Sequence, residues 1–336
     1  MAVSHPNQPV NPSRSSSRPE AHPRAAGSTQ PRMDIYATVT QQIVDAIEQG
    51  IRQDRPPLWR GQGSAQAIPH NFHTGKRYRG INVLTLWIAA NARAYGSGAW
   101  LTYRQAEALG GHVRKAEKAV PVMYYQPVER QRIDTASGEE ETHHGIIIKT
   151  YWLFNLDQIE GIEAPLPTTS EFRGIDTAEQ IIAGSGAVIV EGGTKAFYRP
   201  STDEISLPSR NRFSRAESFY AVALHELTHW TGHSSRLARN FEGRFGDESY
   251  AFEELIAELG AAFMCADTGI APATMNDHAA YVDGWLNVLR RDKKAIFTAA
   301  SQAENAHAFL MASAAAADGN LRLTRRKGRR EPIRAP

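Results

Sequence analysis

The sequence predicts an α+β protein of two domains, a first domain that mixes helices and strands and a second domain that is mostly helical. The chain has 336 residues, and a domain usually holds about 100 to 200 residues. Its composition, 41% hydrophobic and 22% charged, is typical of a globular protein. Helix-like and strand-like patterns alternate before residue 160, whereas long helical patterns fill the chain after residue 208.

Shifts in composition near residues 32, 160 and 320 suggest the domain boundaries. Residues 1–32 hold four Arg and one acidic residue among six Pro and six Ser, and the last 16 residues hold seven basic residues and one acidic residue. Both ends lack the apolar residues that would offset the entropy of ordering. We therefore expect a disordered arm (1–32), a first domain (33–160), a linker (161–175), a second domain (176–318) and a disordered basic tail (319–336).

Cysteine usage and hydropathy indicate a cytoplasmic protein. Cys265 is the one cysteine, which excludes an intramolecular disulfide and fits a reducing compartment. Residues 1–30 contain no apolar run that could serve as the core of a signal peptide. No stretch of 18 apolar residues exists, so the sequence predicts no membrane-spanning segment.

Three helices and a long hairpin are expected in the first domain. Apolar residues repeat every four positions over residues 35–50, which predicts an amphipathic helix, and residues 83–94 and 102–109 predict two more. Gly110 and Gly111 end the third helix. Strand-like residues 119–128 and 145–154 flank a polar segment, 129–144, and so predict a long hairpin.

Residues 55–118 form a basic window, with ten Lys or Arg against two acidic residues, Glu107 and Glu117. Aromatic residues lie among these cations. Single-stranded nucleic acid offers phosphates to cations and unstacked bases to aromatic rings, whereas duplex DNA hides the base faces. A solvated loop is the alternative for the run 74–80, and Trp87 and Tyr95 fit a helix core better. The candidate nucleic-acid contacts are Trp59, Arg60, Phe72, Lys76, Arg77, Tyr78, Arg79, Tyr103, Arg104, Arg114, Lys115 and Lys118.

The second domain opens with short strands and continues with helices. Residues 187–190 and 195–207 read as strands, the latter broken by the turn 200–203. The resulting hairpin either places an edge strand beside the helix that follows or is an ordinary hairpin. Ser214 and Glu217 have capping-box spacing ahead of a helix over 215–230.

This helix carries the motif HExxH, with His225, Glu226 and His229. Residues four apart lie one turn apart on the same helix face, so both imidazoles can bind one metal ion. Glu226 lies about 100° round the helix, where its carboxylate could act as a general base on a metal-bound water. The motif therefore predicts a Zn²⁺ site, with another divalent transition metal such as Mn²⁺ as an alternative.

A catalytic zinc site needs a third protein ligand, and a later helix supplies the best candidate. Residues 250–267 carry an apolar stripe at helical spacing, with Glu254 and Glu258 on the opposite face. We expect Glu254 as the third ligand and Glu258 as a carboxylate that supports a metal-bound histidine. Glu253 is an alternative ligand. His233 is a poorer one, because Gly232 should end the first helix before it.

Small residues accompany the two glutamates on their helix face. A solvated face would carry long polar side chains, whereas these small residues would let another helix approach closely and half-bury the carboxylates. Burial of an unpaired carboxylate is unfavourable unless a cation compensates it. The small residues are Ala257, Ala261 and Cys265.

Several longer motifs in order make the chain resemble the ArdC-type antirestriction proteins of conjugative plasmids. The N-terminal ones begin at Asp34 (DIY), Pro57 (PLW), Gly75 (GKRYRGIN), Trp100 (WLTY) and Tyr151 (YWLFN). The C-terminal ones are HELTHWTGH from His225 and EELIAE from Glu253. The resemblance covers nearly all of residues 33–312.

This resemblance implies a single-strand DNA-binding N-terminal half, similar to a region of certain plasmid primases, and a zincin-like metallopeptidase domain. The implied function is to shield incoming DNA from restriction during conjugation in the bacterial cytoplasm, with duplex DNA bound more weakly. The alternative is an active zinc metallopeptidase, recruited to DNA, that cleaves a protein such as a restriction enzyme. A purely structural zinc fits less well, because such sites usually have four protein ligands. The oligomeric state stays open.

Overall fold

The computed structural model describes residues 34–53, 67–133, 140–163, 173–239, 241, 247–270 and 278–327. Several predictions lie outside these residues: the arm 1–32, Trp59 and Arg60, most of the linker, and the last residues of the tail. The descriptions below concern the described residues.

The N-terminal half is α+β, as predicted. Helices α1 (Ile35–Arg52), α2 (Ile81–Ala92) and α3 (Tyr103–Ala108) confirm the three expected helices. Strands β1 (His70–Asn71), β2 (Ala99–Thr102), β4 (Val120–Ile133) and β5 (Glu140–Asn155) form one sheet in the order β1-β2-β5-β4. A smaller pair joins β3 (His112–Val113) to β6 (Ile159–Glu160), after the short 3-10 helix η3 (Leu156–Gln158).

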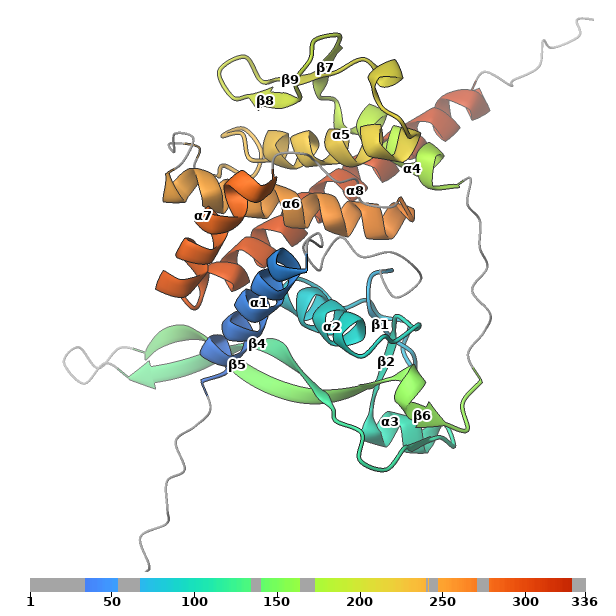
Figure 1. The fold of residues 1–336 in the computed structure, drawn as a ribbon, viewed down its shortest axis with the longest axis vertical. Helices are drawn as coiled ribbons and strands as arrows, with labels where there is room; N and C mark the ends of the chain where they lie inside the picture. The colour runs from blue at the N-terminus through green and yellow to red at the C-terminus, as the bar shows by residue number, and fades with distance from the viewer. Residues whose placement is uncertain are drawn as a thin grey trace, which may run out of the picture. The chain divides into compact units, whose positions relative to one another are not determined.

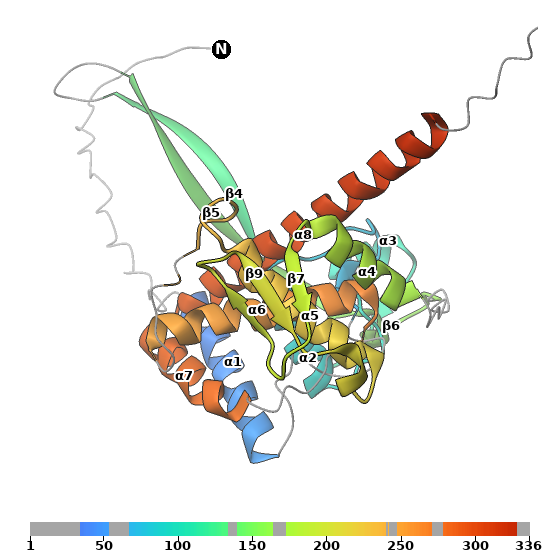
Figure 2. The same ribbon diagram turned by 90° about the horizontal axis from the view of Figure 1, so that it is seen from above.

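The expected long hairpin is present as a two-stranded ribbon. β4 and β5 pair in antiparallel register from Val120↔Leu153 to Ile133↔Glu140. β2 pairs with β5 only at residues 153–155, so the rest of the ribbon has no third strand among the described residues. In Figure 2 its outer part reaches away from the helices.

The C-terminal half is mostly helical, also as predicted. Its helices are α4 (Arg173–Ser185), α5 (Ala216–Thr231), α6 (Glu248–Thr268), α7 (His278–Arg291) and α8 (Ala295–Lys327) (Figure 1). Strands β7 (Val188–Glu191), β8 (Phe197–Arg199) and β9 (Glu204–Leu207) form a sheet in the order β7-β9-β8, followed by the 3-10 helix η4 (Arg210–Arg212). α8 continues beyond residue 318, where we expected the tail to begin.

One detail of the α5 start differs from the sequence prediction. The helix begins at Ala216, and Arg215 is its N-cap residue, with extended backbone angles and no side-chain cap. Ser214 therefore lies one residue too early to cap the helix, and the predicted capping box is wrong.

The two halves share a hydrophobic core. α1 and α2 contribute Val39, Ile43 and Trp87, which belong to the same buried cluster as Phe263 of α6 and Trp285 of α7. The rings of Trp87 and Phe263 lie 5.8 Å apart between centroids. The prediction that Trp87 is a core residue is thus confirmed. No helix in the described part of the chain is long and apolar enough to cross a membrane.

α5 and α6 approach each other closely at a glycine. A Cβ atom on Gly260 would lie 2.5 Å from Cγ2 of Thr228, which is far inside van der Waals contact. The expected small residues of α6 are buried too, with Ala257 and Cys265 at 0% and 1% exposure. This close approach positions the α6 carboxylates against the α5 histidines.

Candidate metal centre

The two histidines of the HExxH motif lie side by side on α5. Their Nε2 atoms are 3.2 Å apart, and their rings are inclined at 78°. Both residues are buried, His225 at 3% exposure and His229 at 8%. The helix ends at Thr231, and Gly232 is its C-cap residue. The predicted one-turn arrangement of the imidazoles is therefore present.

Glu254 of α6 completes a cluster of three donor groups. Its Oε2 lies 3.5 Å from Nε2 of His225, and its Oε1 lies 3.5 Å from Nε2 of His229. The three ligand atoms all lie within 4.8 Å of one another. Two ligand atoms bound tetrahedrally to zinc at about 2.0–2.1 Å are about 3.3 Å apart. The donor types and their spacing thus fit one small divalent cation.

A carboxylate lies behind each imidazole. Glu253 Oε1 is 3.1 Å from Nδ1 of His229, and Glu258 Oε1 is 3.5 Å from Nδ1 of His225. A proton on Nδ1 of His229, donated to Glu253, would leave Nε2 of that ring free to face a cation, whereas Nδ1 of His225 makes no hydrogen bond with a described residue. The two Nε2 atoms lie 3.2 Å apart, close to the spacing of two ligand atoms on one metal ion, which is a second observation that fits such an ion.

Arg239 holds the carboxylate behind His229. Its guanidinium donates to Glu253 Oε1 at 2.9 Å and to Oε2 at 3.0 Å. It also donates to the Thr231 hydroxyl at 2.9 Å and to the backbone carbonyl of Thr228. The side chains of Arg239 and Glu253 are 4% and 7% exposed. The network therefore joins the segment after α5 to α6 directly beside the histidines.

The burial of these groups shifts their proton affinities. Burial alone would lower the pKa of His229, but Glu254 and Glu253 raise it well above its ordinary value. Burial would likewise lower the pKa of His225, and its hydrogen bond to Glu254 and the Glu258 charge raise it. Burial would raise the pKa of Glu254, yet both imidazoles hold it below its ordinary value. These shifts favour protonated imidazoles beside an ionised carboxylate, and perturbed proton affinities of this kind cluster at functional sites.

Glu226 is buried on another side of α5, toward β8. It is 4% exposed, and a hydrogen bond from the Tyr198 backbone favours its charged form. Burial nevertheless raises the pKa of Glu226. β8 is an edge strand, so the predicted hairpin has its edge beside the candidate metal centre.

The alternative ligands occupy other places. Nδ1 of His233 contacts the Ser235 hydroxyl at 2.8 Å, beyond the end of α5. Glu253 faces Nδ1 of His229 and not the Nε2 side where the three donors meet. Sequence reasoning missed the supporting role of Glu253 and of Arg239. The signal was available, because two histidine ligands call for two supporting carboxylates, and α6 offers Glu253 and Glu258 for them.

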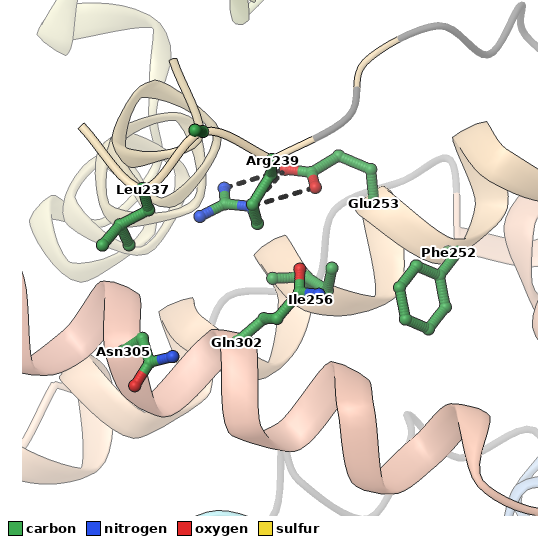
Figure 3. A pocket seen from close by; sticks show the side chains of 8 residues that line it. Leu237, Arg239, Phe252, Glu253, Ile256, Gln302 and Asn305 are labelled. Carbon is green, nitrogen blue, oxygen red and sulfur yellow. Dashed lines mark hydrogen bonds and ion pairs between the residues drawn. The ribbon is translucent and has the colours of Figure 1, made fainter. Parts of the chain in front are cut away.

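A pocket of about 320 Å³ lies behind the Arg239–Glu253 pair. Figure 3 shows the dashed contacts of Arg239 with Glu253 at its upper edge and Gln302 and Asn305 of α8 below. The remaining lining comes from Leu237, Ala238, Phe252 and Ile256.

Three of the predicted nucleic-acid contacts form ion pairs within the protein. Arg77 donates to Asp267 of α6, which also contacts Nε2 of His307 at 2.9 Å. Arg79 lies 3.7 Å from Glu304 of α8. Arg114 pairs with Glu117 at 2.9 Å. The first two pairs attach the loop between β1 and α2 to the C-terminal helices.

Four other predicted cations are exposed, and none of them forms an ion pair with another residue that the structure describes. Of the aromatic candidates, Tyr103 is 50% exposed. Phe72 packs against the cluster around Leu101, and Tyr78 is half-buried with a hydrogen bond from Asn71. The four exposed cations are Lys76, Arg104, Lys115 and Lys118.

In comparisons with known proteins, two family models match this chain. Residues 33–154 match the family model of the N-terminal domain of anti-restriction factor ArdC, and residues 176–302 match that of a zincin-like metallopeptidase. The uncharacterized protein y4eC of Sinorhizobium fredii is 42% identical over 81% of this chain and 89% of its own length. DNA primase TraC of Escherichia coli is 37% identical over 84% of this chain, which spans only 20% of that protein.

Solved structures of the antirestriction ArdC protein from plasmid R388 have the same fold. The metal-free structure is 41% identical with a TM-score of 0.69, and it covers 84% of this chain and 98% of its own. The Mn(II)-bound structure is 38% identical with a TM-score of 0.68 and the same coverage. The chain therefore belongs to the ArdC antirestriction family and carries a zincin-like domain in its C-terminal half.

Proposed function

We propose that this protein binds single-stranded DNA through its N-terminal half and shields incoming DNA from restriction in the bacterial cytoplasm. Membership of the antirestriction family is the observation that carries this proposal. Four exposed cations support it, because none of them forms an ion pair with another described residue, so each can neutralise a phosphate of bound DNA. These cations are Lys76, Arg104, Lys115 and Lys118. Tyr103, exposed beside Arg104, offers a ring for base stacking.

The same proposal assigns a divalent metal, Zn²⁺, to His225, His229 and Glu254. Three buried donors that meet within 4.8 Å support this assignment, and a related structure contains Mn(II). A bound divalent cation would supply positive charge to polarise a ligand oxygen. Glu253 and Glu258 would orient the two imidazoles, and Glu226 would hold or release a proton beside them.

The DNA-binding part is tested by affinity for labelled oligonucleotides at several salt concentrations. For wild-type protein we expect a steep loss of affinity with salt, and a preference for single-stranded over duplex oligonucleotides. The combined variant Arg104→Ala, Lys115→Ala, Lys118→Ala should bind less tightly with a shallower salt slope. Affinity that does not respond to salt would contradict the proposal.

Peptidase activity is the second candidate function, and the position of Glu226 beside the edge strand β8 is the observation that favours it. The Glu226→Gln variant separates the two functions. We expect it to keep metal content, oligonucleotide affinity and protection of DNA from a restriction enzyme. Loss of protection with metal content and affinity intact would favour the peptidase, and cleavage of the restriction enzyme by wild-type protein alone would identify its substrate.

A further inference from the structure

The β4–β5 ribbon exposes an unusual number of large apolar side chains. All of them lie outside the basic window, residues 55–118, in which the candidate DNA contacts were found. Large exposed apolar groups in one place generally mark a binding surface. The exposed large apolar residues of this ribbon, with their exposed fractions, are Tyr124 (53%), Tyr125 (39%), Ile146 (67%), Ile147 (38%), Ile148 (36%), Tyr151 (45%) and Trp152 (51%).

The register separates these residues into two rows on opposite faces. Tyr124 pairs with Lys149, Gln126 with Ile147, and Val122 with Tyr151, so these positions share one face. We call this set the tyrosine face. The other face carries Trp152, Ile148 and Ile146 opposite Pro121, Tyr125 and Pro127.

Two aromatic rings and a cation lie together on the tyrosine face. The ring centroids of Tyr124 and Tyr151 are 6.2 Å apart with the planes at 78°. Lys149 is directly opposite Tyr124 and two residues from Tyr151. Its side chain is exposed and forms no ion pair with another described residue. Both rings remain about half open to solvent although they touch each other.

The tyrosine face also has the charge that a nucleic acid requires. From Val122 to Val128 on β4, and from Gly145 to Tyr151 on β5, its positions include the cation Lys149 and no Asp or Glu. Glu129, which follows this stretch on β4, falls in the opposite row and lies 3.7 Å from His144. Aromatic rings beside cations with no neighbouring carboxylate suit a strand of unpaired bases and phosphates.

We propose that the tyrosine face is a binding site for single-stranded DNA, in which Tyr124 and Tyr151 stack on bases and Lys149 contacts a phosphate. This inference rests on the proposed function and names a surface for it apart from the exposed cations of the basic window. Figure 2 shows the outer part of the ribbon reaching away from the helices.

The test measures fluorescence anisotropy of a labelled oligothymidylate with full-length variants. Tyr124→Ala and Tyr151→Ala should each weaken binding about tenfold, whereas Tyr124→Phe and Tyr151→Phe should stay within about twofold of wild type, because they keep the ring. Lys149→Ala should lower the salt slope by about 0.7, the value for one phosphate contact on a single strand. Ile146→Ala is the matched control, since it removes exposed apolar surface from the opposite face.

Other results would overturn the inference in recognisable ways. If the Tyr→Ala variants bind like wild type while the Arg104, Lys115 and Lys118 variant is weakened, DNA binding stands and the tyrosine face is not its site. If wild-type protein does not bind the oligonucleotide at all, the proposed function fails as well. If Tyr124→Ala changes the mass in sedimentation equilibrium and not the affinity, the ribbon is a contact between copies of this chain.

Discussion

The Glu253 carboxylate lies 3.1 Å from Nδ1 of His229, while Nε2 of the same ring faces His225 at 3.2 Å. Adjacent residues on α6 therefore have different positions relative to one imidazole, because successive helical residues are about 100° apart. Glu254 faces the Nε2 atoms and Glu253 supports the ring from behind.

The first prediction separates the two glutamates by metal affinity. Glu253→Gln should lower the affinity for Zn²⁺ about 10- to 100-fold, because it weakens the hydrogen bond that orients His229, yet leave one ion bound at saturation. Glu254→Gln removes a ligand and should leave less than one ion bound per chain. Competition with a chromogenic chelator and metal analysis measure both quantities. The reverse pattern would make Glu253 the ligand.

A second prediction concerns the buried Arg239–Glu253 pair. Removing one partner of a buried ion pair leaves an uncompensated charge, which costs about 3–5 kcal/mol of stability. Arg239→Ala should therefore lower the free energy of unfolding of the metal-free protein by about that amount in urea. Arg290→Ala is the control, because its pair with Glu48 is half-exposed and should contribute less than about 1 kcal/mol. Equal losses of unfolding free energy in the two variants would show that burial does not determine how much the Arg239–Glu253 pair stabilises the protein.

A third prediction uses two neighbouring cations of the basic window. Arg77 is bound to Asp267, whose side chain is 11% exposed, whereas Lys76 has no such partner among the described residues. Arg77→Ala should cost about 1–2 kcal/mol of stability and change oligonucleotide affinity little. Lys76→Ala should change stability little and weaken oligonucleotide binding. Urea unfolding and anisotropy on the same samples check the pair, and a large affinity loss for Arg77→Ala would mean that DNA displaces Asp267.

The sequence could predict the histidines and the third ligand of the candidate metal centre, but not the long-range ion pairs around it. HExxH places two histidines on one face by helical geometry alone, and the apolar stripe and small residues of α6 led to Glu254, which the structure brings together with both histidines. The sequence could not reveal that Arg77 meets Asp267, since 190 residues separate them and no local pattern reports such a contact. The start of α5 was misjudged for a similar reason, because the chain turns into the helix at Arg215 and not at Ser214.

The packing at Gly260 gives a fourth prediction. Alanine stabilises an exposed helix by about 1 kcal/mol relative to glycine, but a Cβ here would meet Thr228 at 2.5 Å. Gly260→Ala should therefore lower stability by about 1–3 kcal/mol and weaken metal binding, because α6 carries Glu254. Thr228→Ala in the same chain should restore most of both losses. A single variant as stable as wild type would show that the helices separate without cost.

The last prediction concerns acid stability and the Asp203–Arg236 pair. Hydrogen bonds from Arg236 lower the pKa of Asp203, although partial burial opposes this shift. The folded state then binds the proton more weakly than the unfolded state, whose Asp pKa is about 3.9. The stabilisation is therefore complete above that pH and is lost as the pH falls through the lower pKa of the folded state.

Asp203→Asn should be less stable than wild type at pH 7, and the difference should shrink below about pH 4. Urea unfolding at pH 7, 5 and 3 tests this, and a difference that does not change with pH would assign the effect to packing. Since Arg236 also lies over the Trp230 ring at 3.7 Å, the pair joins the β8–β9 turn to the end of α5 and keeps the edge strand beside Glu226.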